Sequence, residues 1–174
     1  MLTKYVPDKY QKSIYTINYK KLKREGIKCL IFDLDNTLVP ASVNEVSKKL
    51  KDFINDLKIM GFKVIIMSNS PKNRVQIFQK ALMVDAAALS FKPNKDKYEK
   101  IIKLYGFKAE DIACIGDSIT TDILGANKME FTSILVNSMS KSDHYIKFFN
   151  KLEEKRILNN LRKKDLLVKE RYYD

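Results

Sequence analysis

The sequence predicts an α/β fold in which a doubly wound, five-stranded parallel sheet carries helices on both faces. Three observations support this prediction. Short apolar runs alternate with longer segments of helical periodicity, the runs are apolar enough to be buried on both faces, and polar clusters follow several of them. With 174 residues, 45% of them apolar, the chain can bury one core but is short for two. We therefore expect a single domain over residues 1–174.

The first half of the chain supplies three of the strands and two helices. Each strand is an apolar run, and each helix has apolar residues three or four positions apart. Gly61 ends the first helix, and Ser70-Pro71 begins the second, with Ser70 as a plausible N-cap. In chain order the segments are strand 28–32, helix 43–60, strand 62–67, the helix that opens at 70–71, and strand 86–89.

The second half of the chain continues the same alternation. Its first helix ends at Gly106, and the Gly-Asp-Ser triplet at 116–118 separates the next strand from the helix that follows it. In chain order the segments are helix 93–105, strand 112–115, helix 119–128 and strand 131–136. The regular exchange of strand and helix is what a parallel sheet with crossover helices requires.

Positive charge gathers at the two ends of the chain. Of the net charge of +12, residues 1–25 carry +5 and residues 139–174 carry +4. We expect a basic N-terminal segment (1–25) and a basic helical C-terminal segment (about 141–174), both with interleaved aromatic residues. Such segments suit peripheral contact with an anionic membrane or, less well, nucleic acid. The alternative is that the aromatic residues pack onto the helices and the lysines face water.

Targeting and redox signals point to the cytoplasm. No apolar stretch approaches the ~18–20 residues of a membrane-spanning helix, and the first residues lack the pattern of a signal peptide. Cys29 and Cys114 lie in apolar runs and are too few for a disulfide scaffold or a zinc site. We therefore expect a cytoplasmic protein, peripheral at the inner face of the membrane if its basic ends bind lipid.

Polar residues follow the predicted strands at their carboxyl ends. In an open parallel sheet these ends lie at one edge, and ligands bind there. The residues expected at this edge are Asp33, Asp35, Ser68, Asn69, Lys92 and Asp117. Polar loops after strands, with Ser and Asp as ordinary helix caps, are the simpler interpretation, but it does not explain why several acids and a lysine converge.

This combination of residues suits phosphoryl transfer. Carboxylates that are held together repel one another, and a divalent cation that prefers hard oxygen ligands, Mg²⁺ above all, would relieve that repulsion. A lysine, a hydroxyl group and the start of the helix at Pro71 favour a bound anion. One carboxylate could attack phosphorus, and a second could act as general acid and base.

Four motifs resemble those of the haloacid dehalogenase-like (HAD) superfamily, in order and in spacing. They are Asp33-Leu34-Asp35-Asn36-Thr37, similar to D-x-D-x-T; Ser68 after its strand; Lys92 before Pro93; and Gly116-Asp117 through Asp122, similar to G-D-x-x-x-x-D. A lone D-x-D would be weak evidence, but four motifs on the expected strands are specific. The resemblance implies the Rossmann-type fold of that superfamily.

The resemblance also implies a role for each of these residues. Asp33 would be the nucleophile and Asp35 the general acid and base, with Lys92 at the reacting phosphoryl group. The phosphate would be bound by Thr37, Ser68, Asn69 and Lys92. The Mg²⁺ ligands would be Asp33, Asp35 through its main-chain carbonyl, Asp117 and Asp122. For Asp122, an acid that merely favours the start of a helix is the alternative.

Further segments narrow the resemblance. Asn36, Ser-Asn-Ser at 68–70 and the run 121–127 are similar to bacterial YqeG-type phosphatases of subfamily IIIA, a group similar to the mitochondrial phosphatidylglycerophosphatase. This implies a Mg²⁺-dependent phosphatase that works through an aspartyl phosphate, with phosphatidylglycerophosphate as a candidate substrate. Two alternatives stay open. One is a phosphatase of a soluble sugar or nucleotide phosphate, and the other is a non-catalytic protein of this fold that binds RNA or a protein partner.

The segments between the motifs are short. Residues 38–67 and residues 69–91 each hold about one helix, whereas a cap domain would need ~50 residues or more. We therefore expect no cap domain and an open site. Such a site would admit the phosphate of a membrane lipid or a macromolecule, unless a second subunit of a homo-oligomer covers it.

Overall fold

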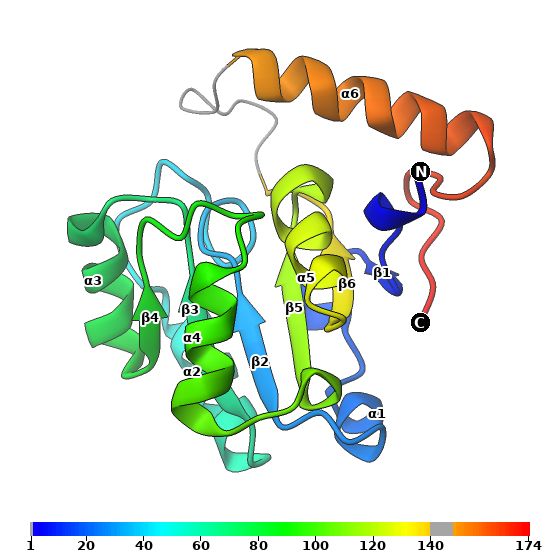
Figure 1. The fold of residues 1–174 in the computed structure, drawn as a ribbon. Coiled ribbons are helices and arrows are strands. Elements are labelled where there is room, and N and C mark those ends of the chain that lie inside the picture. The colour runs from blue at the N-terminus through cyan, green and yellow to red at the C-terminus, as the bar shows by residue number, and fades with distance from the viewer. Residues whose placement is uncertain (1, 140–147) are drawn as a thin grey trace.

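The computed structural model describes residues 2–139 and 148–174. Over these residues a six-stranded, entirely parallel sheet has the order β1-β6-β5-β2-β3-β4 (Figure 1). The strands are β1 (Lys9–Gln11), β2 (Cys29–Phe32), β3 (Lys63–Met67), β4 (Asp85–Ala87), β5 (Ile112–Gly116) and β6 (Thr132–Val136). The α/β parallel sheet is confirmed, but the expected number of strands, five, is wrong by one.

Helices connect the strands and cover both faces of the sheet (Figure 1). The α-helices are α1 (Tyr19–Arg24), α2 (Lys48–Ile59), α3 (Lys72–Leu82), α4 (Asp96–Tyr105), α5 (Leu124–Lys128) and α6 (Phe148–Lys163). Short 3-10 turns are η1 (Leu2–Tyr5), η2 (Ile14–Thr16) and η3 (Ala109–Asp111), and a π-helical turn, η4 (Ile119–Ile123), leads into α5. Of the expected C-terminal helical segment, residues 140–147 lie outside the described residues.

The additional strand is β1, which pairs with β6 at the edge of the sheet. Only Tyr10, its central residue, is buried, so this strand contains no apolar run that a sequence pattern could reveal. Tyr10 also exchanges two main-chain hydrogen bonds with Tyr173, of 2.8 and 2.9 Å. The two ends of the chain therefore meet at this edge.

The helix α2 begins five residues later than its apolar spacing predicts. Ser47 caps it, because the side chain of Ser47 accepts a hydrogen bond from the main-chain N–H of Leu50. Val43 and Val46 continue the helical spacing backwards, but they lie in the preceding loop and pack against the core while partly exposed. Loop residues that pack on the core thus have the same apolar spacing in the sequence as an additional helical turn.

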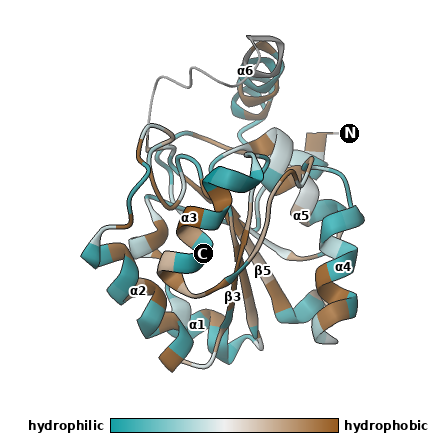
Figure 2. Ribbon diagram, turned by 90° about the vertical axis from the view of Figure 1, so that its left-hand side faces the viewer, coloured by the Kyte–Doolittle hydropathy of each residue, from teal (hydrophilic) through white to brown (hydrophobic). Residues whose placement is uncertain are grey.

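The sheet separates two apolar layers, as alternation along its strands requires. In β2, Leu30 and Phe32 pack on the side of α2 and α3, whereas Cys29 and Ile31 pack on the side of α4. Figure 2 shows the apolar strands inside and polar surfaces on the outer sides of the helices. Both free cysteines are buried, as expected.

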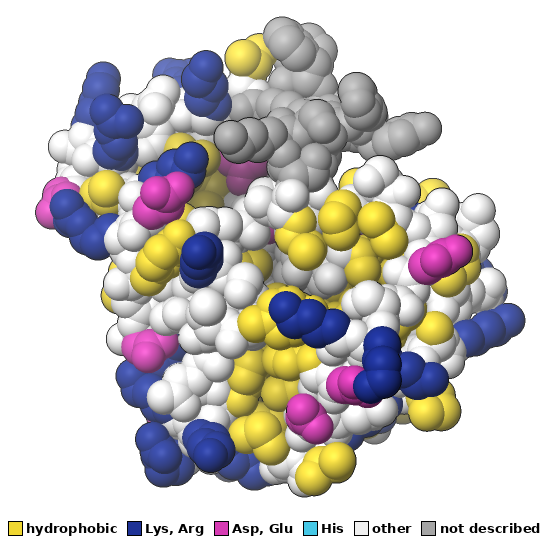
Figure 3. All heavy atoms as spheres, turned by 180° about the vertical axis from the view of Figure 1, so that it is seen from behind, with side chains coloured by type: hydrophobic (Ala, Val, Ile, Leu, Met, Phe, Trp, Pro, Cys, Tyr) yellow, Lys and Arg dark blue, Asp and Glu magenta, His cyan; other side chains and the backbone are white. Residues whose placement is uncertain are grey.

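A third apolar cluster joins the two basic ends of the chain. Tyr10 packs there with Ile157 and Leu161 of α6 and with Leu135 of β6. Figure 3 shows basic side chains distributed over the surface with acidic side chains between them. Tyr10, and Tyr19 in another cluster, are therefore buried, as the alternative interpretation of the chain ends requires, whereas Tyr15 is 38% exposed. Among the described residues, no helix has the length and hydrophobicity needed to cross a bilayer.

Candidate active site

A tight loop after β2 carries the two aspartates of the first motif. Asn36 has left-handed backbone (φ 62°), and its N–H donates to the carbonyl of Val39 at 2.6 Å. The main-chain N–H of Asp33 donates to the carbonyl of Ile115 at 2.9 Å, which holds the start of this loop against β5. The loop therefore places the carboxylates at the carboxyl ends of the central strands, where the sequence predicts them.

Lys92 lies at the centre of the site. Its Nζ donates to Asp33 Oδ1 at 2.6 Å, to Asp122 Oδ1 at 2.5 Å and to the carbonyl of Met67 at 2.9 Å. Burial alone would lower the pKa of Lys92, but the charges of Asp122 and Asp33 outweigh burial and hold it well above its usual value. The lysine is therefore a buried positive charge between two carboxylates.

Three carboxylates converge beside this lysine. Asp33, Asp117 and Asp122 each offer an oxygen, and these oxygens lie within 4.8 Å of one another. Burial, with the charge of Asp122, raises the pKa of Asp33 to about 7 although Lys92 opposes the shift. Burial, together with the negative charges of Asp33 and Asp122, raises the pKa of Asp117 well above its usual value. Buried, mutually repelling oxygen donors are a ligand set that fits a divalent cation such as Mg²⁺.

The fourth motif brings Asp122 into the cluster through a close approach. The carboxylate of Asp122 accepts the N–H of Ser118 at 3.2 Å and lies directly against Gly116. A Cβ atom at position 116 would lie 2.2 Å from the carboxyl carbon of Asp122. Glycine at this position is therefore a packing requirement of the site.

The residues expected to bind phosphate hold other parts of the site in this structure. Ser68 is buried, and its Oγ accepts the N–H of Ser70 at 3.0 Å. Asn69 accepts the main-chain N–H of Lys92 at 2.8 Å and donates to its carbonyl at 3.4 Å. Thr37 donates to Asp117 Oδ1 at 3.1 Å. Asn69 thus positions the lysine, and Thr37 positions an acid of the cluster.

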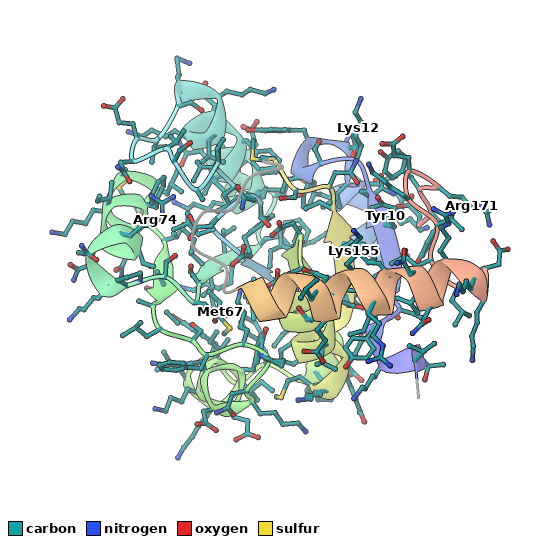
Figure 4. All side chains as sticks on the ribbon, turned by 90° about the horizontal axis from the view of Figure 1, so that it is seen from above. Tyr10, Lys12, Met67, Arg74, Lys155 and Arg171 are labelled. Atoms are coloured by element: carbon teal, nitrogen blue, oxygen red, sulfur yellow. The ribbon has the colours of Figure 1, made fainter. Side chains whose placement is uncertain are left out.

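The carboxylate of Asp35 is bound by two residues that the motif pattern does not include. Arg74 Nε donates to Asp35 Oδ1 at 2.7 Å, and the Ser70 hydroxyl donates to Asp35 Oδ2. Arg74 also donates to the carbonyl of Val43 at 3.0 Å and to Asn44 Oδ1 at 2.6 Å, so it ties the loop before α2 to the site. Figure 4, seen from above the strand ends, shows Arg74 on the side of α3.

The expectation that Ser70 caps α3 is wrong. The N-cap of α3 is Pro71, with no side-chain cap hydrogen bond. The Ser70 hydroxyl donates its hydrogen bond to Asp35 instead. The signal that could have found both residues is their spacing. Ser70 and Arg74 are four positions apart at the start of a helix that faces the predicted edge.

The C-terminal helix also contacts the site loops. Glu154 of α6 accepts the Ser118 hydroxyl at 3.0 Å and the N–H of Ile119 at 2.8 Å. These bonds attach α6 to the loop that carries Asp117. Burial raises the pKa of Glu154, although the bonds from Ile119 and Ser118 oppose the shift. Sequence reasoning missed this contact, because nothing in a basic helix marks one of its acids.

Comparison with known proteins identifies the family. The sequence family described as haloacid dehalogenase-like hydrolase matches residues 41–129. The "Probable phosphatase YqeG" of Bacillus subtilis is 36% identical over 165 residues, which are 94% of this chain and 96% of that protein. This chain is a haloacid dehalogenase-like hydrolase. The family resemblance inferred from the four motifs is confirmed.

More distant relatives of the hydrolase extend the comparison. "Phosphatidylglycerophosphate phosphatase 1, chloroplastic/mitochondrial" of Arabidopsis thaliana is 23% identical over 141 residues, 76% of this chain and 40% of that protein. A solved structure described as a HAD-like family hydrolase of Porphyromonas gingivalis has a TM-score of 0.53 at 14% identity, covering 74% of this chain and 98% of its own. An uncharacterized protein of Listeria monocytogenes has a TM-score of 0.54 at 17% identity, covering 69% and 85%. These two structures share the fold of the hydrolase.

Proposed function

We propose that this hydrolase is a Mg²⁺-dependent phosphatase that cleaves phosphomonoesters through a phosphorylated Asp33. The observation that carries the proposal is the buried cluster in which Lys92 contacts Asp33 and Asp122 while Asp117 lies within metal-ligand distance. The name of the Bacillus subtilis relative, a probable phosphatase, supports the same reaction.

In the first step, a carboxylate oxygen of Asp33 attacks phosphorus and the bond from phosphorus to the ester oxygen breaks. The ammonium of Lys92 is placed to neutralise negative charge on the phosphoryl oxygens as they pass Asp33. Asp35 donates a proton to the leaving alkoxide. The products of this step are the alcohol and an aspartyl phosphate at Asp33.

In the second step, Asp35 removes a proton from a water molecule, which attacks the phosphorus of the aspartyl phosphate. Inorganic phosphate leaves, the carboxylate of Asp33 is restored, and Asp35 is again protonated. The Ser70 and Arg74 contacts fix the carboxylate of Asp35 in the resting site, so these two residues would orient the acid and base.

The cation would be held by the carboxylates of Asp33 and Asp117 and the main-chain carbonyl of Asp35, with Asp122 beside them. When bound, Mg²⁺ supplies positive charge that stabilises the transferring phosphoryl group. It would also relieve the repulsion that raises the pKa values of Asp33 and Asp117 in the metal-free cluster.

Mg²⁺ is expected to raise the melting temperature by about 5–10 °C at saturation, and more at about pH 8 than at about pH 5.5. The folded pKa values of Asp33 and Asp117 lie above the unfolded value of about 3.9. The metal-free protein therefore loses stability as pH rises from about 4 to about 7, between the unfolded and folded pKa values of Asp33, and the cation restores that stability. Thermal unfolding with Mg²⁺ or EDTA at both pH values measures the effect.

Two variants control this measurement. Asp117→Asn should abolish the Mg²⁺-dependent shift, whereas Asp52→Asn, which alters an exposed acid of α2, should keep it. A shift that is the same at both pH values, or that survives Asp117→Asn, would mean that the cation binds elsewhere.

Asp35→Asn is expected to slow esters with poor leaving groups about 100- to 10,000-fold while affecting p-nitrophenyl phosphate far less in the first step. The reason is that p-nitrophenolate leaves without a proton, whereas an alkoxide requires one. Pre-steady-state release of alcohol from both kinds of ester measures the difference. Equal losses of rate on both substrates would show that Asp35 is not the general acid.

We further propose phosphatidylglycerophosphate as the substrate. The support is the similarity to the Arabidopsis thaliana phosphatidylglycerophosphate phosphatase and the short segments between the motifs, which leave little chain to enclose a small metabolite. The alternative is a soluble sugar or nucleotide phosphate. Hydrolysis of the lipid in anionic vesicles, compared with a panel of soluble phosphomonoesters, should favour the lipid about 100-fold or more in kcat/KM. Preference for a soluble ester would exclude this lipid as the substrate, but it would not contradict the proposed phosphatase activity.

A further inference from the structure

Two large apolar side chains project from the loop between β4 and α4, beside the site. The side chain of Leu89 is 46% exposed and that of Phe91 is 69% exposed. The N–H of Leu89 donates to the carbonyl of Ser70 at 3.0 Å, and Phe91 directly precedes Lys92, whose main chain is held by Asn69. The loop is thus fixed to the site, and the residues that carry these apolar side chains lie next to Ser70 and Lys92.

The backbone of this loop is unusual at the same two residues. Leu89 and Phe91 have φ values of 47° and 51°, in the left-handed region that bulky residues rarely adopt. Ser90, between them, is buried and donates its hydroxyl to the carbonyl of Ala87 at 2.9 Å. The loop therefore buries the small polar residue and exposes the two large apolar ones, and strained backbone of this kind gathers at functional sites.

A third exposed apolar residue is held by its main chain to the loop of the first motif. Met139 is 50% exposed, and its N–H donates to the carbonyl of Asn36 at 2.9 Å, in the loop that carries Asp33 and Asp35. Exposure alone would not distinguish this face, because Ile59 and Leu104 are 83% and 73% exposed. Ile59 lies at the carboxyl-terminal end of α2, away from the site, whereas Leu104 of α4 lines a hollow between α3 and α4 together with Leu89.

Exposed basic side chains lie on the helices next to the site. Lys72 begins α3, Lys95 immediately precedes α4, and Lys155 lies on α6, the helix attached to the site loops through Glu154. Seen from above the strand ends, Figure 4 shows Lys155 on α6, across the site from Arg74. Apolar tips among lysines suit the boundary between lipid headgroups and acyl chains, and the lysines complement anionic headgroups.

We propose that this mouth face, defined by Leu89, Phe91 and Met139 with Lys72, Lys95 and Lys155, docks on an anionic lipid bilayer. The phosphate of a lipid then enters the site from the plane of the membrane, with the three apolar side chains among the acyl chains. This proposal rests on the proposed phosphatase function, which gives docking its role. The test below measures membrane binding and not activity, so failure of docking can be distinguished from failure of the phosphatase function.

The experiment is vesicle flotation of the Asp33→Asn protein, in which turnover is expected to be at least about a thousandfold slower, with phosphatidylglycerol-containing vesicles and with neutral phosphatidylcholine vesicles. We expect flotation with the anionic vesicles at low salt and weaker flotation at high salt. The double variant Leu89→Ser/Phe91→Ser should lower the affinity about tenfold or more. The control Ile59→Ser removes an apolar side chain of greater exposure from the carboxyl-terminal end of α2 and should stay within about twofold.

A fluorescent probe reads the same face without removing an apolar side chain. The chain has no tryptophan, so Phe91→Trp gives a single reporter at the mouth and Ile59→Trp a single reporter at the carboxyl-terminal end of α2. Anionic vesicles should shift the emission of Phe91→Trp to shorter wavelength and leave that of Ile59→Trp unchanged.

Each remaining outcome overturns the proposal. These outcomes are absent flotation at low salt, equal losses in the mouth and control variants, an unshifted Phe91→Trp spectrum, and binding to single-stranded RNA that excludes the vesicles. Phosphatase activity of the unaltered protein on p-nitrophenyl phosphate, measured in parallel, tests the proposed function independently of docking.

Discussion

Replacing Asp33 by asparagine is expected to lower kcat on p-nitrophenyl phosphate about a thousandfold or more, while the protein stays folded. An amide is a poor nucleophile towards phosphorus, and it also removes one of the three oxygens of the acidic cluster. The fold should persist because the amide oxygen can still accept the hydrogen bond from Lys92 and because one of three repelling charges is removed. Steady-state kinetics and circular dichroism of the purified variant measure both effects.

A matched variant shows whether the loss belongs to the site. Asp56→Asn makes the same chemical change in α2, away from the carboxyl ends of the strands, and should retain the activity of the unaltered protein. Turnover by Asp33→Asn at the rate of the unaltered protein would exclude Asp33 as the nucleophile.

Replacing Lys92 by methionine is expected to abolish activity and to lower the free energy of unfolding by about 3–5 kcal/mol in EDTA at neutral pH. The substitution keeps the volume of the buried side chain but leaves Asp33 and Asp122 without their cation. Urea unfolding measures the loss. At lower pH the same carboxyls are protonated, so the difference between Lys92→Met and the unaltered protein should shrink as pH falls.

An exposed lysine provides the comparison for this substitution. Lys95→Met, three positions along the chain at the start of α4, should change the free energy of unfolding by less than about 0.5 kcal/mol. A stability loss for Lys92→Met that does not vary with pH would show that lost packing, and not unpaired charge, is responsible.

The strands that the sequence predicts well are those buried on both faces. β2 and β5 are fully buried along their length, so their apolar runs are unambiguous. β1 escapes prediction because it has three residues and one buried side chain, Tyr10, and its partners come from β6 and from Tyr173, near the end of the sequence. Edge strands that depend on distant segments have no local pattern to reveal them.

The candidate site also contains residues that local sequence predicts and residues that it does not. The acids and Lys92 are predictable because they follow strands whose carboxyl ends share one edge. Arg74 and Glu154 are not, because each reaches the site from a helix through a contact between segments more than 30 residues apart. Local sequence identifies the groups that would react, whereas the residues that hold them are set by tertiary packing.

Chemical trapping of the intermediate tests the central claim most directly. Asp35→Asn with p-nitrophenyl phosphate should form the aspartyl phosphate but hydrolyse it slowly, because the base for the second step is missing. Acid quenching, borohydride reduction and peptide mass spectrometry should then find the reduced side chain at position 33 only when Mg²⁺ is present. Release of p-nitrophenol with no modification at Asp33, or with the modification at another residue, would contradict the account.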